Sequence, residues 1–160
     1  MSASTKILAG TAVGAGVVAG IAYIMNIKRA QASLEVKPQA YIHKLDWNGL
    51  TIRVDALLKN PTRASFKIKF PYIRIDHKDT LLGSSQVINK DIRIPAFGEA
   101  FIKDIMIVIP VLSFFSVIYE LIKALMAKQP ISLFVTTVTT IDLGWTNLPF
   151  NDKKEVVIKR

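Results

Sequence analysis

Six basic side chains within one stretch of twenty residues have the clearest capacity for binding in this sequence. Their charges could contact the phosphates of nucleic acid or of anionic lipid, provided that the fold places them on one face. Aromatic residues for base stacking are sparse among them, so sequence-selective binding of nucleic acid is not expected. The six residues are Lys59, Arg63, Lys67, Lys69, Arg74 and Lys78.

The residue types that carry catalysis or bind metals do not form a recognisable arrangement. The two histidines, His43 and His77, have no neighbours at metal-ligand spacing, and Asp76 and Asp79 beside His77 are typical of a solvated turn. The threonines of residues 136–140 are typical of a β-strand. Cysteine is absent, and no glycine-rich phosphate loop is present. The sequence therefore predicts a protein that is not an enzyme and that uses no cofactor, metal or small-molecule substrate.

Alternating apolar and polar residues from about residue 34 onward predict a mainly β domain. The alternation shifts by one residue at Pro71, which predicts a β-bulge or a strand that crosses from one sheet to the other. The apolar set comprises Leu50, Ile52, Val54 and Ala56, then Phe66, Ile68 and Phe70, and after the shift Ile73 and Ile75.

The pair Asn60-Pro61 separates two of these strands. Proline cannot donate a backbone hydrogen bond, and it disfavours the helical conformation at Asn60. The asparagine side chain can in turn bond to a nearby backbone group. We therefore expect a turn here that ends one strand and leads into the next.

Further strands are predicted at residues 85–94, 100–109, 131–142 and 154–159. The turn signals between them are "LLGS", "PAFG", "LGWTN" and "PFND". This strand spacing predicts a β-sandwich.

Residues 111–128 instead show helical periodicity, with a narrow polar stripe formed by Ser113, Ser116, Glu120, Lys123 and Ala127. Part of the wide apolar arc should cover an open end or edge of the sandwich. The remainder should contact a partner or enter a membrane. A second transmembrane span is disfavoured, because charged side chains lie near the middle of the segment.

Residues 7–27 contain no charged side chain and, as a helix, would be roughly 30 Å long, which matches a bilayer core. A cleaved signal peptide is the alternative, with "AQA" at residues 30–32 resembling a cleavage site. The apolar run is too long for this, and Lys28 and Arg29 stand between it and the possible cleavage site. We therefore expect an uncleaved transmembrane helix.

Small residues within this anchor could allow close helix packing and self-association, although glycine is also simply common in such segments. The packing residues are Gly10, Gly14, Gly16 and Gly20. Tyr23, Lys28 and Arg29 are expected at the membrane interface. The surplus of basic residues after the span predicts a single-pass protein with its domain on the cytoplasmic side, or the corresponding side of a virion membrane.

The ordered features of residues 34–160 resemble the water-stress and hypersensitive-response (WHy) domain of late-embryogenesis-abundant (LEA) class-two proteins. The resemblance rests on "LTIRVDALLKNPT", on "IRIPAFGEAFIKDIMIVIPV" leading into one helix, and on "ISLFVTTVTTIDL". It implies a fibronectin-like or immunoglobulin-like β-sandwich with one helix and no catalytic residues. The family's proposed roles are protective, structural or adaptor-like. The glycine-rich anchor and the net charge of +9 set this chain apart from many desiccation-linked members.

The sequence thus predicts a membrane anchor with a short linker at residues 1–32 and a β-sandwich at 33–160. The first functional hypothesis is a non-enzymatic, membrane-anchored structural or adaptor protein. It would present a basic sandwich within a larger assembly, such as an envelope complex or a lipid-containing virus particle. One alternative is a membrane-tethered protein that binds nucleic acid without sequence selectivity, and another is stress protection. The expected partners are the bilayer, other proteins and further copies of the chain.

Because we expect no cleavage, the intact mass of protein extracted from membranes should correspond to the full N-terminus. A mature chain that begins near Ser33 would instead identify a removed signal peptide.

Overall fold

The computed structural model describes residues 25, 33–142, 144 and 146–158. Apart from Met25, the predicted anchor at 7–27 lies outside the described residues, as do its glycines, Tyr23, Lys28 and Arg29. Within the described part of the chain, no helix is long and apolar enough to cross a bilayer.

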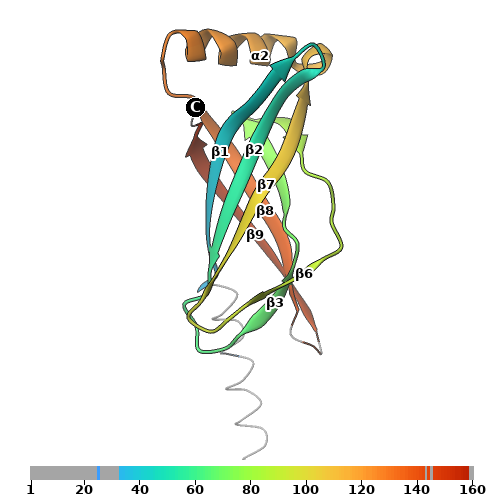
Figure 1. Ribbon diagram of the computed structural model, residues 1–160, viewed down its shortest axis with the longest axis vertical. Helices are drawn as coiled ribbons and strands as arrows, with labels where there is room; N and C mark the ends of the chain where they lie inside the picture. Colours follow the sequence, from blue (N-terminus) through green and yellow to red (C-terminus); the bar gives the residue numbers. More distant parts are fainter. Residues whose placement is uncertain (1–24, 26–32, 143, 145, 159–160) are drawn as a thin grey trace, which may run out of the picture.

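Nine strands form two antiparallel sheets among the described residues (Figure 1). The smaller sheet has the order β1-β2-β7, with β1 at Glu35–Asp46, β2 at Gly49–Lys59 and β7 at Glu99–Pro110. The larger sheet has the order β5-β4-β8-β3-β6, and β9 pairs with β8. Its strands are β3 (Phe66–Lys69), β4 (Tyr72–His77), β5 (Thr80–Ser84), β6 (Asp91–Ile94), β8 (Ser132–Asp142) and β9 (Asn147–Val157).

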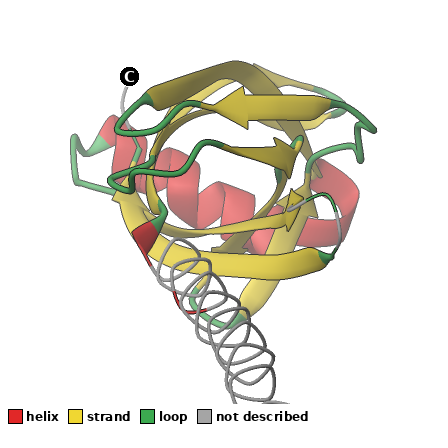
Figure 2. Cartoon of the chain, turned by 90° about the horizontal axis from the view of Figure 1, so that it is seen from below, coloured by secondary structure: helices red, strands yellow, loops and turns green. Residues whose placement is uncertain are grey.

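The two sheets curl around a single apolar core, and the strands form a ring when the domain is viewed along its length (Figure 2). The predicted inward faces of β2, β3 and β4 are confirmed. Leu50, Ile52, Ile68, Ile73 and Ile75 are all buried. The domain is therefore mainly β with one helix, as expected, and its two-sheet sandwich closes towards a barrel.

The change of alternation at Pro71 is a bulge, and the strand does not cross to the other sheet. Both β3 and β4 pair with β8, with Ile68 opposite Ile141 and Tyr72 opposite Val138. The four residue steps from Ile68 to Tyr72 therefore match only three steps along β8, from Ile141 to Val138. The extra residue shifts the register so that apolar side chains on both sides of Pro71 face the core.

The predicted helix at 111–128 is observed as α2 (Val111–Met126), and it covers one end of the barrel (Figures 1 and 2). Ile118 and Leu121 are buried against the core, whereas the predicted polar stripe is exposed. We call this the helix end. The opposite end, where the described domain begins at Ser33, is the proximal end.

The Asn60-Pro61 turn lies at the proximal end and connects the two sheets. Asn60 is only 1% exposed. Its Nδ2 donates to the carbonyls of Ala64 and Pro95, each at 2.8 Å, and its Oδ1 accepts from the backbone N–H and hydroxyl of Thr62. Its backbone N–H donates to Gly98 O at 2.9 Å. One side chain thus fixes both the turn after β2 and the turn before β7.

Three details of the sequence-based strand assignment were wrong. The predicted strand at 85–94 is reduced to β6, because the chain leaves the sheet after Ser85 and residues 86–90 are exposed. The expected turn "LLGS" belongs to β5, where Leu82 is drawn into the core. The expected turn "PFND" lies within β9, an edge strand in which Pro149 is tolerated opposite Thr140.

Replacing Asn60 by alanine should destabilise the domain by about 2 kcal/mol, because it removes the buried amide that hydrogen-bonds to both turns. Urea unfolding of the full chain in detergent, followed by circular dichroism, measures this loss. Asn89→Ala is the control, because Asn89 lies in the exposed loop between β5 and β6. Equal unfolding midpoints for the two variants would contradict the role assigned to Asn60.

Candidate interaction surfaces at the two ends of the barrel

The structure brings four of the six candidate cations onto the outer face of the larger sheet. Lys67 and Lys69 lie on β3, Arg74 lies on β4, and Lys78 follows directly after β4. Lys59 belongs to the other sheet, and Arg63 is exposed in the turn between β2 and β3. The six residues therefore extend along the length of the domain and do not form one cluster.

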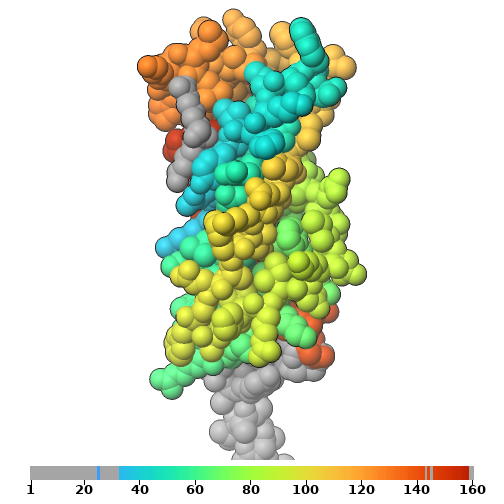
Figure 3. Space-filling view, viewed as in Figure 1, coloured from blue at the N-terminus to red at the C-terminus, as the bar shows by residue number. Residues whose placement is uncertain are grey.

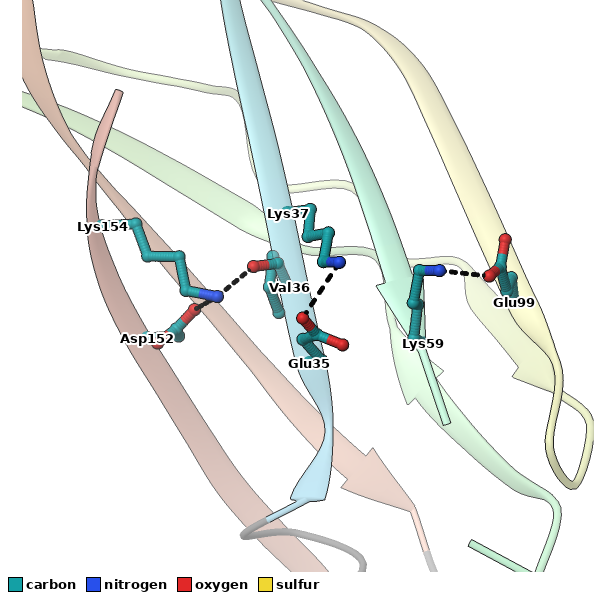
Figure 4. Close-up of polar contacts among 7 residues, drawn as sticks. All are labelled: Glu35, Val36, Lys37, Lys59, Glu99, Asp152 and Lys154. Atoms are coloured by element: carbon teal, nitrogen blue, oxygen red, sulfur yellow. Dashed lines mark hydrogen bonds and ion pairs between the residues drawn. The ribbon is translucent and has the colours of Figure 1, made fainter. Parts of the chain in front are cut away.

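Carboxylates neutralise much of this basic surface. Lys69 Nζ lies 2.6 Å from Asp91 Oδ1, and Lys59 Nζ lies 2.6 Å from Glu99 Oε1 (Figure 4). Weaker pairs join Arg74 to Asp76 at 3.8 Å and Lys78 to Glu120 at 3.7 Å. The outer face is thus a mixed-charge surface. This arrangement does not favour a continuous track for nucleic acid.

The hydrogen bonds of the two short ion pairs shift the pKa of Asp91, Lys69 and Lys59. The bond from Lys69 lowers the pKa of the Asp91 carboxyl below 3.8, with smaller contributions from the charges of Lys69 and Lys67. The bond to Glu99 raises the pKa of Lys59 above 10.5. Both pairs are solvent-exposed, so they fix local charge and contribute little to stability.

A side chain from β9 reaches β1 near the proximal end (Figure 4). Lys154 Nζ donates to the backbone carbonyl of Val36 and lies 3.4 Å from Asp152 Oδ2. On β1 itself, Lys37 Nζ lies 3.2 Å from Glu35 Oε1. The two sheets are therefore joined at this edge through a side chain.

The histidines and threonines occupy structural or surface positions. His43 is exposed on β1, and His77 Nδ1 lies 3.3 Å from Ser132 O beside an open cavity of about 390 Å³ under α2. The hydroxyl of Thr139 donates to Lys69 O at 2.5 Å, beside the bulge. Within the described residues, no group of three histidine or acidic side chains could hold a metal ion.

The proximal end carries an exposed aromatic residue in a strained conformation. Phe97 lies in the turn between β6 and β7, is 68% exposed and has a φ of 51°. This left-handed conformation costs roughly 1–2 kcal/mol for a residue other than glycine. The turn is held by bonds from Phe97 N to Thr62 O and from Gly98 N to Pro95 O. Pro95 and Ala96, beside the ring, are also exposed.

The helix end carries an apolar groove of about 220 Å³ between α2 and the tip of the β1–β2 hairpin. Trp47 at the tip is 99% exposed, and Leu112 on α2 is 97% exposed. In Figure 3 the hairpin tip (cyan) protrudes beside α2 (orange). Except for the carboxylate of Asp46, the side chains that line the groove are apolar or aromatic, namely those of Leu45, Trp47, Val111, Phe115, Ile118, Tyr119 and Ile122.

The hairpin tip is fixed by hydrogen bonds to the Asp46 side chain and by close packing at Gly49. Asp46 Oδ1 accepts hydrogen bonds from the N–H groups of Asn48 and Gly49 at 2.9 and 3.2 Å. Gly49 has a φ of 154°, and a Cβ atom there would lie 2.2 Å from Ile109 O. Trp47 is therefore presented on a defined turn.

Sequence reasoning did not single out Trp47 or Phe97. Asn48-Gly49 between two alternating runs is a strong hairpin signal that would have placed Trp47 at a turn. The turn "PAFG" was identified, but a propensity argument does not reveal that its phenylalanine is exposed.

No protein-family model and no curated protein matches the chain. Similar solved structures include the crystal structure of a protein from Archaeoglobus fulgidus, with 15% identity, a TM-score of 0.47, and coverage of 80% of this chain and 99% of that one. The solution structure of an Arabidopsis thaliana protein shows 15% identity and a TM-score of 0.42, covering 76% and 80%. A solution structure described as "a putative late embryogenesis abundant (LEA) protein" shows 15% identity and a TM-score of 0.37, covering 98% and 90%. Similarity at this level identifies neither the family nor a function.

The Asp91 carboxyl should titrate below its usual pKa of 3.8, and Lys69→Met should raise that pKa by removing the hydrogen bond. Since the pKa is lowered in the folded state, the stabilising effect of the pair is present above the unfolded-state pKa. It is lost as the pH falls through the folded-state value. Carbon-detected NMR titration measures the pKa of Asp91 in the unmodified chain and in the Lys69→Met variant. Lys67→Met is the control and should raise the pKa less, because Lys67 acts only through its charge.

Proposed function

We propose that the protein is a non-enzymatic, membrane-anchored adaptor whose helix end binds an apolar segment of another protein. The observation that carries this proposal is the groove between Trp47 and α2. The anchor remains the sequence-based prediction for residues 7–27. The barrel would hold the groove at a fixed distance from the membrane.

The helix end exposes more apolar surface than the domain needs for its own fold. On α2, Leu112, Phe115, Tyr119 and Met126 are exposed, whereas Ile118 and Leu121 alone are buried. Burial of one large aromatic side chain removes about 150 Å² or more from water, which is worth about 4 kcal/mol. Exposed apolar patches of this kind mark interaction sites on soluble domains.

The position of the groove favours a protein partner over the anchoring bilayer. β1 begins at the proximal end and reaches the hairpin tip after twelve residues, so the groove lies about 40 Å from Ser33 along the barrel. A concave groove with few polar groups suits the apolar face of an amphipathic helix, which inserts large side chains at regular spacing.

We also interpret the domain as a WHy-type sandwich on the strength of its sequence motifs. The mainly β architecture, the single helix and the buried Asn60 beside Pro61 support this interpretation. An adaptor role agrees with the roles proposed for that family. A stress-protective role is the weaker alternative, because it does not account for the groove.

A photo-crosslinking phenylalanine analogue at Phe115, introduced into the full chain in its native membranes, should form an adduct with a discrete protein. Trp47→Ser should reduce the yield of that adduct about tenfold, because it removes one wall of the groove. Trp47 is fully exposed, so its replacement leaves the core intact. Mass spectrometry identifies the adduct.

The same analogue at Phe101 is the matched control, because Phe101 is a comparably exposed phenylalanine outside the groove. Equal adducts from both positions, or adducts that survive Trp47→Ser, would exclude a specific groove partner. Adducts formed only with lipid, or only with a second copy of the chain, would likewise overturn the proposal.

A further inference from the structure

The backbone of the exposed Phe97 is held in place by hydrogen bonds within and beside its turn. The N–H of Phe97 donates to Thr62 O at 2.9 Å, and the buried Asn60 bonds to Pro95 and to Gly98 on either side of the ring. A residue kept in a sparsely populated conformation by surrounding bonds suggests function more strongly than an ordinary exposed side chain does. Here the conformation projects an aromatic ring, together with Pro95 and Ala96, into solvent.

Three cations lie on the turn and strands that adjoin this apolar tip. Arg63 is exposed in the facing turn. Lys67 and Arg93 are direct cross-strand neighbours on β3 and β6, and Arg93 Nη2 lies 3.4 Å from Ser65 Oγ in that turn. Of the nearby carboxylates, Glu99 and Asp91 are already paired with Lys59 and Lys69, and Asp142 lies opposite Lys67 on β8. The tip therefore combines exposed apolar groups with a positive rim.

The tip lies at the end of the barrel where the described domain begins. Glu35 at the start of β1 pairs with Lys59, and Lys59 pairs with Glu99 at the start of β7. Figure 1 shows these strand ends together, opposite α2. The chain between Ile27 and Ser33 reaches at most about 20 Å. If residues 7–27 span a bilayer, the tip must lie close to its surface.

We propose that this tip docks onto the anionic surface of the bilayer that holds the anchor, with Phe97 entering the interface and Arg63, Lys67 and Arg93 contacting lipid phosphates. The proposal rests on the anchor of the proposed function. Aromatic side chains favour the headgroup region, and basic residues beside them are attracted to anionic lipid. Docking would fix the orientation of the barrel and direct the helix end away from the membrane.

The test uses the natural absence of cysteine. A single cysteine at Ala96 or at Asn48 carries an environment-sensitive fluorophore, and the full chain is reconstituted into phosphatidylcholine vesicles with or without phosphatidylserine. The Ala96 probe should gain intensity several-fold with phosphatidylserine, and nitroxide lipids labelled near the headgroup should quench it. The Asn48 probe at the helix end should remain in water.

Two variants separate the aromatic and charged contributions. Phe97→Asn removes the ring but suits the left-handed backbone, so it should preserve the fold while it abolishes quenching. Arg63→Gln and Lys67→Gln should each lower the ratio of docked to undocked protein by about fivefold in phosphatidylserine vesicles. Neither should have an effect in pure phosphatidylcholine.

Flotation of the same samples distinguishes this inference from the proposed function. If the chain floats with the vesicles and the Ala96 probe stays in water, docking is refuted and the anchored adaptor stands. A chain that does not float refutes the anchor, and the inference with it. A probe that responds to an added oligonucleotide and not to phosphatidylserine would assign these cations to nucleic acid.

Discussion

The buried carboxamide of Asn60 is the polar group on which the arrangement of the two sheets depends. A buried amide must have its hydrogen bonds satisfied, and Asn60 can satisfy them only when Ala64 and Pro95 lie on either side of it. That requirement places the chain entering β3 beside the chain leaving β6. Pro61, which cannot extend β2, directs the chain into this arrangement. The inward faces of the strands then meet around one core, and α2 covers its open end.

The two ends of the barrel differ in chemistry because different constraints shape them. At the helix end, α2 must bury Ile118 and Leu121, and its remaining apolar arc borders the hairpin tip to form the groove. At the proximal end, turns and paired charges surround the bonds of Asn60, and Phe97 is exposed on the turn that follows Arg93 and β6. We propose that one domain thus binds an apolar protein segment at one end and an anionic interface at the other.

Alternation and turn chemistry were sufficient to predict the β domain, its inward faces and the helix, because each depends on local periodicity. At Pro71 they predicted a change of register but left a bulge and a crossing to the other sheet as alternatives. The limits of β5 and β9 could not be read in this way. In β5, burial of Leu82 in the core stabilises a strand where the residue types favour a turn. In β9, pairing with β8 along the whole strand does the same. The sequence also could not show which of the basic side chains form ion pairs. The partners of Lys59 and Lys69 lie some forty and twenty residues away in the sequence, at Glu99 and Asp91, so only tertiary pairing shows which cations are neutralised.

The length of β1 has a mechanical consequence. This strand runs from the proximal end to the helix end and pairs with β2 throughout, from Glu35 opposite Lys59 to Asp46 opposite Gly49. A pull between a membrane at one end and a bound protein at the other would act parallel to these strands. The ladder would then be loaded in shear, with its hydrogen bonds sharing the force, whereas a sideways pull would peel them apart in turn. Along its axis, the barrel should therefore resist tension better than across it.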